Sequence, residues 1–201
     1  MKLERDFYNR ETLTVARQLL GKILVHHKNG VNTSGKIVEV EAYLGMIDKA
    51  AHTFNGKRTT RVEYMYGIPG VAYVYFIYGM HYCFNAVTRE KGIAEAVLVR
   101  AIEPVIGIDE MSIRRYKMHS NELSNKKLLN LTSGPAKLCS ALSINKDDNG
   151  KDLCGNSLYI EDSIVDNFEI ETLRRIGIAY SKEAAEFLWR FSVKGNPYVS
   201  K

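Results

Sequence analysis

The sequence predicts an α+β fold, with residues 1–201 forming a single domain on a curved antiparallel sheet with flanking helices and a protruding β-hairpin. Residues 37–43 alternate with a period of two, which is typical of a strand, whereas 11–20 has apolar residues at helical spacing. Around Gly79, two runs rich in β-branched and aromatic residues predict a hairpin. A chain of 201 residues fits one domain with a substantial core, and no second core is expected.

The composition is that of an ordinary globular protein. Hydrophobic residues make up 45% and charged residues 25% of the chain, so it should fold throughout. The first residues, MKLERDFYNRETL, lack the apolar run of a signal peptide, and no stretch predicts a membrane span. Three cysteines without CxxC spacing suit reduced thiols, so we expect a cytoplasmic location and no metal site.

The first third of the chain predicts a helix followed by a hairpin. The helix covers 11–20 and ends at Gly21, and a strand at 22–27 follows. Asn29-Gly30 supplies the turn chemistry that pairs the strand 35–44 back on its predecessor. An irregular basic stretch, 48–70, comes next and contains Lys57, Arg58 and Arg61.

The centre of the chain predicts an antiparallel meander. Strands at 71–78, 80–87 and 95–102 make the sheet core. The pattern from 104 to 129 is helical and has a cationic surface formed by Arg114, Arg115, Lys117, Lys126 and Lys127.

The last third predicts helices and short strands in turn. Ser133-Gly134-Pro135 begins a helix that continues over 136–142. Short strands are predicted at 158–160 and 168–173, a helix capped by Ser181 at 181–189, and an edge strand at 190–193.

Two glutamates share one face of the predicted strand IVEVEAY. Alternation places Ile37, Glu39, Glu41 and Tyr43 together, and the two glutamate Cα atoms roughly 6.7 Å apart. Paired carboxylates at such a spacing can work on a glycosidic bond. A solvated strand face gives the same pattern, so both interpretations stay open.

The aromatic run YVYFIYGMHY and nearby His52 allow two interpretations. Its tyrosines can form a sheet core, and His52 can be a structural, hydrogen-bonded histidine. Both can instead line a pocket. Tyr78 stands apart, because a bulky ring directly before Gly79 projects from the hairpin tip and needs a partner to cover it.

Arg100 interrupts the apolar strand AVLVRAI and must reach solvent or find an acceptor inside. A nearby glutamate would satisfy it, and such a pair suits either a general base or a structural ion pair. Asn85 is either a strand-terminal hydrogen bonder or a side chain that recognises a base edge.

Net charge favours an anionic partner. The formal charge is +5 at pH 7, and a basic protein gains from displacing the counterions of phosphates.

Seven blocks of sequence carry these residues and resemble, in the same order, the 3-methyladenine DNA glycosylases of the alkyladenine type. The blocks are VEVEAYLG, AAH, YVYFIYGMHYCFN, VLVRAIEP, LTSGPAKLC, RRIGI and FSVKGNPYVS, and the likeness runs from about residue 13 to residue 200. The resemblance implies an enzyme that acts on damaged double-stranded DNA and hydrolyses the bond between an alkylated or deaminated purine and deoxyribose. It implies no metal or cofactor and no strand cleavage.

The resemblance also implies a role for each candidate residue. Glu41 is implied to be the general base, with Arg100 and the main chain of Ile176 holding the water. The implied pocket residues are Tyr43, His52 and Tyr75, which sandwich the base, Tyr78, which wedges into the vacated stack, and Asn85, which disfavours guanine. Glu39 has no catalytic role in the family.

Two other functions fit the residues alone. One is a nucleosidase or glycoside hydrolase that uses Glu39 and Glu41 as a carboxylate pair. The other is a basic nucleic-acid-binding module whose aromatic rings stack single strands without catalysis. For the favoured interpretation we expect a monomer that acts on DNA and has no membrane contact.

Overall fold

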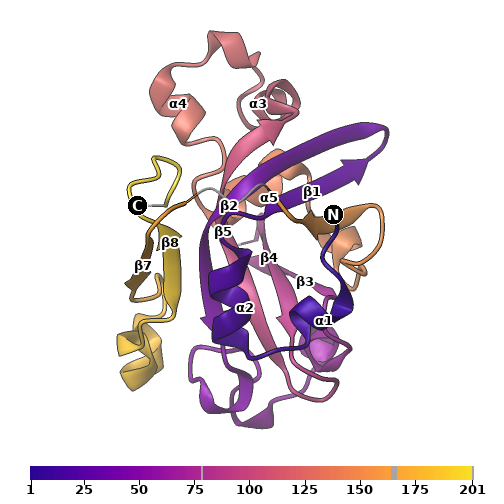
Figure 1. Cartoon of the computed structure of the whole chain (residues 1–201), viewed down its shortest axis with the longest axis vertical. Coiled ribbons are helices and arrows are strands. Elements are labelled where there is room, and N and C mark those ends of the chain that lie inside the picture. The colour runs from indigo at the N-terminus through magenta and orange to yellow at the C-terminus, as the bar shows by residue number, and fades with distance from the viewer. Residues whose placement is uncertain (78, 164–166, 201) are drawn as a thin grey trace.

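The fold is a curled antiparallel sheet with helices packed around it (Figure 1). The computed structural model describes residues 1–77, 79–163 and 167–200. In these ranges eight strands pair along the path β3-β4-β5-β2-β1-β6, with β8 paired to β2 and β7 to β8. The strands are β1 (Ile23–Lys28), β2 (Val31–Tyr43), β3 (Ala72–Ile77), β4 (His81–Thr88), β5 (Glu95–Ile106), β6 (Leu158–Glu161), β7 (Ile170–Leu173) and β8 (Arg190–Val193). The predicted α+β fold is confirmed.

Strand β2 is the centre of the sheet. Its first half pairs with β1 across the predicted Asn29-Gly30 turn, where both residues have positive φ. Its second half pairs with β8 on one edge, while β5 follows nearly its whole length on the other. Glu39 and Glu41 therefore lie between two neighbouring strands, in the interior of the sheet.

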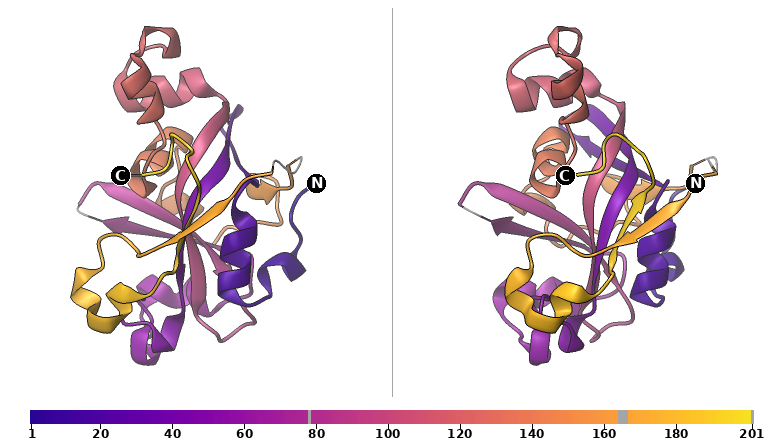
Figure 2. Two further views of the ribbon diagram at one scale, coloured as in Figure 1. Left: turned by 60° about the vertical axis from the view of Figure 1, so that its left-hand side comes forward. Right: turned by 90° about the vertical axis from the view of Figure 1, so that its left-hand side faces the viewer.

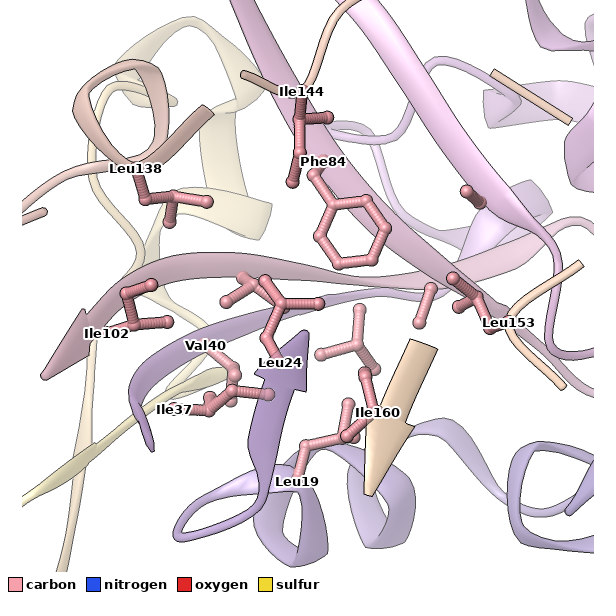
Figure 3. Close-up of a cluster of buried hydrophobic side chains, with 14 of the residues drawn as sticks. Leu19, Leu24, Ile37, Val40, Phe84, Ile102, Leu138, Ile144, Leu153 and Ile160 are labelled. Atoms are coloured by element: carbon pink, nitrogen blue, oxygen red, sulfur yellow. The ribbon is translucent and has the colours of Figure 1, made fainter. Parts of the chain in front are cut away.

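The face predicted for Ile37 on β2 is wrong. The register between β2 and β5 shifts on both sides of Glu39. Ile37 and Val40, three positions apart, consequently both pack in the main core, where strict alternation would separate them (Figure 3). The irregularity leaves Glu39 and Glu41 on the face away from that core.

Short helices complete the core. Helix α2 (Thr12–Leu19) is capped by the Glu11 carboxylate, which accepts from the backbone N–H groups of Leu13 and Thr14, and α5 (Pro135–Leu142) begins with the predicted proline. Both helices bury apolar side chains against the sheet. The other helices are α1 (Arg5–Tyr8), α3 (Ile108–Tyr116), α4 (Asn125–Leu129) and the 3₁₀ segments Gly45–Ile47, Phe54–Gly56, Thr60–Tyr66, Ser120–Glu122, Lys146–Asp148 and Ala179–Glu186. No helix of the described ranges has the length and apolar character needed to cross a bilayer.

Two predicted helices differ from the observed ones. The stretch 104–129 begins as strand, because β5 continues to Ile106, and then forms α3, a 3₁₀ turn and α4, which project beyond the sheet in Figure 1. The helix predicted for 181–189 is wrong. Lys182 has φ 55° and ψ −124° within a 3₁₀ segment, and the Ser181 hydroxyl donates to the Ile178 carbonyl instead of capping.

Strands β3 and β4 form the predicted hairpin, which extends away from the body of the molecule in both views of Figure 2. Its register pairs Tyr73 with Asn85 and Tyr75 with Cys83. Tyr78, predicted at the tip, lies outside the described residues. The two strands of the hairpin thus carry two candidate site residues, Tyr75 and Asn85.

Candidate active site

Glu41 is a buried carboxylate held by three donors. Its side chain has no solvent exposure. One oxygen accepts from the Ile176 backbone N–H at 2.7 Å and lies 3.2 Å from Arg100 Nη1, and the other accepts from the Tyr43 hydroxyl at 2.8 Å. A carboxylate offers about four acceptor sites, so one remains for a water molecule.

Arg100 joins the two glutamates of β2. Its Nε donates to Glu39 at 3.0 Å, while its Nη1 faces Glu41. Glu39 also accepts from Arg190 Nη1 at 3.0 Å and from the Ser200 backbone N–H at 2.8 Å. Burial disfavours the charge on Arg100, but Glu41 and Glu39 outweigh burial and raise its pKa. The solvated strand face is therefore excluded for both glutamates, and the predicted ion pair of Arg100 is confirmed.

A cavity of about 320 Å³ opens beside this cluster. Its volume is at the lower end of the range for small-molecule pockets. Glu41 lies directly behind the wall formed by its three partners. The lining includes every predicted pocket residue in the described ranges: Tyr43, His52, Tyr75, Asn85, Arg100 and Ile176.

His52 lines the cavity as a neutral ring. Its Nδ1 lies 2.9 Å from the Tyr73 hydroxyl, and its ring meets Tyr75 edge-on at 4.7 Å between centroids. Burial, with further contributions from Arg61 and Lys57, lowers the pKa of His52 to about 4. The structural and the pocket-lining interpretations of His52 are thus both correct.

The tyrosine hydroxyls stay protonated. Burial raises the pKa of Tyr43 and of Tyr75 well above the usual value, and the Glu41 charge adds to the effect on both. Tyr43 consequently remains a donor to Glu41. Asn85 is fixed as well, because its Nδ2 donates to the Tyr73 carbonyl at 3.0 Å.

A cationic groove adjoins the cavity. It has a volume of about 310 Å³ and shares Ala50, His52 and Tyr180 with the cavity lining. Its basic side chains are Lys49, Lys57 and Arg61. A nucleic-acid strand that delivers a base to the cavity would find neutralising charge at this position.

Sequence reasoning missed three contributors to the site. Asp48 and Arg175 form a fully buried ion pair behind Tyr43, and Ser200 binds Glu39. Their partners lie far away in the chain, so no local pattern marked them. The block RRIGI drew attention to Ile176 alone, although its second arginine is completely buried.

These groups suit hydrolysis of a bond in an aromatic ligand. A base and a cation at one wall can activate and orient water, while aromatic rings hold a flat molecule in place. Across the described residues, no group of three or more His, Cys, Asp or Glu side chains could hold a metal ion.

Comparison with known proteins gives one consistent result. The sequence model of the Methylpurine-DNA glycosylase family matches residues 6–197. Proteins whose names include the words 3-methyladenine DNA glycosylase are similar along the whole chain. A relative from Clostridium acetobutylicum is 56% identical over 200 residues, covering 100% of this chain and 98% of its own. Relatives from Alkaliphilus oremlandii and Clostridium tetani are 55% and 53% identical, and each comparison covers 100% of both chains.

Proposed function

The chain belongs to the methylpurine-DNA glycosylase family, and from this premise we propose that it is a monofunctional DNA glycosylase which excises alkylated or deaminated purines during base excision repair. The main observation in support is the position of Glu41, a buried carboxylate bound to Arg100 and the Ile176 amide, which line a ring-lined cavity in front of it. The proposed substrate is damaged double-stranded DNA, and we propose a cytoplasmic monomer with access to the chromosome.

Entry of a base into the cavity requires that its nucleotide rotate out of the duplex. The cost of unstacking is a few kcal/mol and is least for damaged pairs. Tyr43, His52 and Tyr75 line the cavity, and stacking on these rings can return about 1–3 kcal/mol for the base. Tyr78 is proposed to fill the vacated stack, and Asn85 to crowd the exocyclic amine of guanine.

Neutral His52 favours cationic lesions. With a pKa of about 4, the imidazole carries no charge at pH 7 and can contact an alkylated, positively charged purine without repulsion. For the same reason His52 does not protonate a neutral leaving group such as hypoxanthine. A cationic purine needs no such proton, because breaking its glycosidic bond releases a neutral base.

Hydrolysis proceeds by attack of water on C1′. The water oxygen forms a bond to C1′ as the C1′–N bond breaks, and the bonding electron pair leaves with the purine. Glu41 accepts the proton of the water at its remaining acceptor site, while Arg100 and the Ile176 N–H fix the carboxylate. The products are a free purine and an abasic site in an intact strand.

The direct test is Glu41→Gln with duplexes that carry single lesions. Loss of a general base should slow excision by about 10²–10⁴-fold, while affinity for lesion DNA stays within a few-fold. Alkali treatment after incubation reveals abasic sites by strand scission. Wild-type excision rates in the variant would remove Glu41 from the mechanism, and equal affinity for lesion and intact duplex without abasic product would favour a non-catalytic module.

A further inference from the structure

A buried ion pair lies behind the cavity and does not line it. Arg175 Nη1 and Nη2 donate to the two carboxylate oxygens of Asp48, at 2.5 Å and 2.9 Å. Neither side chain is exposed to solvent. The remaining bonds of the guanidinium go to backbone carbonyls of Ala42, at 2.9 Å, and Ala184, at 3.2 Å. Bidentate pairing of this kind adds geometric specificity, so it restricts the orientation of the guanidinium.

This ion pair connects three separate parts of the cavity wall. Ile176, whose backbone N–H binds Glu41, directly follows Arg175 in the chain. Tyr43 presents its ring to the Arg175 guanidinium at 4.8 Å. On the other side, Asp48 accepts from the backbone N–H of Ala50, which lines the cavity two residues before His52. Displacement of the pair would therefore move the base catalyst and the stacking rings together.

The chain's single tryptophan reports on this pair. Trp189 lies 5.0 Å from the Arg175 guanidinium carbon, so the cation contacts both Trp189 and Tyr43. Tyr43 lines the cavity, and Trp189 does not. A change in the position of Arg175 should consequently alter Trp189 fluorescence even where no DNA is bound.

We infer that Asp48 and Arg175 are positioning residues for base excision, which fix the Ile176 amide against Glu41 and the Tyr43 ring against the extruded base. The inference rests on the proposed function and adds two residues to it. Neither residue touches the base. Their effect passes through Ile176, Tyr43 and Ala50, and a displacement of about 1 Å at reacting groups can cost on the order of 100-fold in rate.

The test uses conservative variants and a matched control. Asp48→Asn keeps the shape and removes the charge, and Arg175→Lys keeps the charge and removes the planar fork. The control is Asp148→Asn, which removes a second buried carboxylate. Asp148 pairs with His26, Lys28 and Lys151, none of which lines the cavity. Single-turnover excision and affinity for intact duplex are measured on folded protein, with circular dichroism giving the folded fraction.

We expect Asp48→Asn and Arg175→Lys to slow excision by about 10- to 100-fold, with affinity for intact duplex unchanged within twofold. The double variant should be no slower than the slower single variant, because both act through one pair. Trp189 emission should shift in both variants. Asp148→Asn should excise at the wild-type rate and leave the emission unchanged.

Three results would overturn the inference. One is wild-type excision by folded Arg175→Lys and Asp48→Asn proteins. Another is an equal loss in Asp148→Asn at the same folded fraction, which would indicate a general effect of buried charge. The third is a wild-type chain that excises no base. This result would contradict the proposed function, and the inference would fail with it because it concerns the same reaction.

Discussion

Glu39 and Glu41 show how two identical residues on one strand receive different tasks from their neighbours. Both are fully buried and both contact Arg100. Glu39 is bound by Arg190 and by the Ser200 amide, at the end of the described chain. Glu41 is bound by Tyr43 and Ile176, which line the cavity. Position therefore makes Glu41 the candidate base and Glu39 the support of Arg100.

This difference gives a prediction for Glu39→Gln. The change leaves Arg100 and Arg190 without their shared negative partner, so we expect the free energy of unfolding to fall by about 3–5 kcal/mol in urea titrations. Excision by the folded fraction should fall by no more than about tenfold, far less than in Glu41→Gln. Equal losses of excision in the two variants would instead support the carboxylate-pair hydrolase.

His52 should make the fold less stable in weak acid. Its folded-state pKa of about 4 lies below the ordinary value of 6.5, so between these values the unfolded chain binds a proton that the folded chain does not. The contribution to stability is fully present above pH 6.5 and is lost as the pH falls towards 4, up to about 3 kcal/mol.

Denaturation curves from pH 4 to pH 7 test this expectation. The His52→Gln protein should lose less stability over that window than wild type. His27→Gln, which removes an exposed histidine on β1, is the matched control. A parallel loss in wild type and His52→Gln would show that the imidazole does not resist protonation.

At the scale of elements, the turn after β2 connects Tyr43 to Asp48, and its conformation depends on Gly45. This residue has φ +57°, and an added Cβ would lie 2.6 Å from the Ala94 carbonyl oxygen. Gly30 has φ +76°, but its Cβ would meet nothing within 4 Å. Gly30→Ala should cost about 1–2 kcal/mol for the left-handed backbone alone. Gly45→Ala should cost about 1–3 kcal/mol more.

Chemical denaturation measures both costs, and excision assays add a second comparison. Gly45 lies between Tyr43 and Asp48, so its displacement should slow excision, whereas Gly30→Ala should excise at the wild-type rate. Equal effects of the two substitutions would show that the close approach to Ala94 is relieved without cost.

Elements whose geometry is favoured by local residue types were predictable. A helix interrupted by a lysine with positive φ and a shift in strand register were not. The Asn29-Gly30 turn, the start of α5 at Pro135 and the hairpin around Gly79 follow from residue types that favour one local geometry. Lys182 carries no such signal, yet its positive φ breaks the helix predicted for 181–189. The register shifts beside Glu39 likewise have no marker in the alternating sequence.

The site was predictable only in its nearer contacts. Tyr43 and Glu41 share a strand, and an arginine within an apolar strand must reach solvent or find an acceptor, so a pairing of Arg100 with a nearby glutamate was one of two expected outcomes. The contacts of Arg175 with Asp48 and of Ser200 with Glu39 span 127 and 161 positions. Such pairs arise from the three-dimensional path of the chain, which a single sequence does not reveal.

At the scale of the whole molecule, the net positive charge and the groove beside the cavity both suit DNA, the proposed partner. The chain carries a formal charge of +5. Lys49, Lys57 and Arg61 line a groove that adjoins the cavity, where their charges can neutralise phosphates. The net charge thus supports association with DNA, and its local distribution supports delivery of one base.

Salt should therefore weaken binding and leave chemistry unchanged. If two or three phosphates are neutralised, affinity for duplex DNA should fall by about 10- to 50-fold between 50 and 200 mM salt. Lys57→Gln should reduce the slope of log K against log salt by about 0.9. The control is Lys2→Gln, which removes a cation that packs on Tyr159 and does not line the groove, and it should leave the slope unchanged. Fluorescence anisotropy gives the slopes, and single-turnover excision at saturating enzyme gives the rate of the bound complex. A nucleosidase acting on free nucleosides would show turnover insensitive to salt throughout, so a flat binding slope would contradict DNA as the substrate.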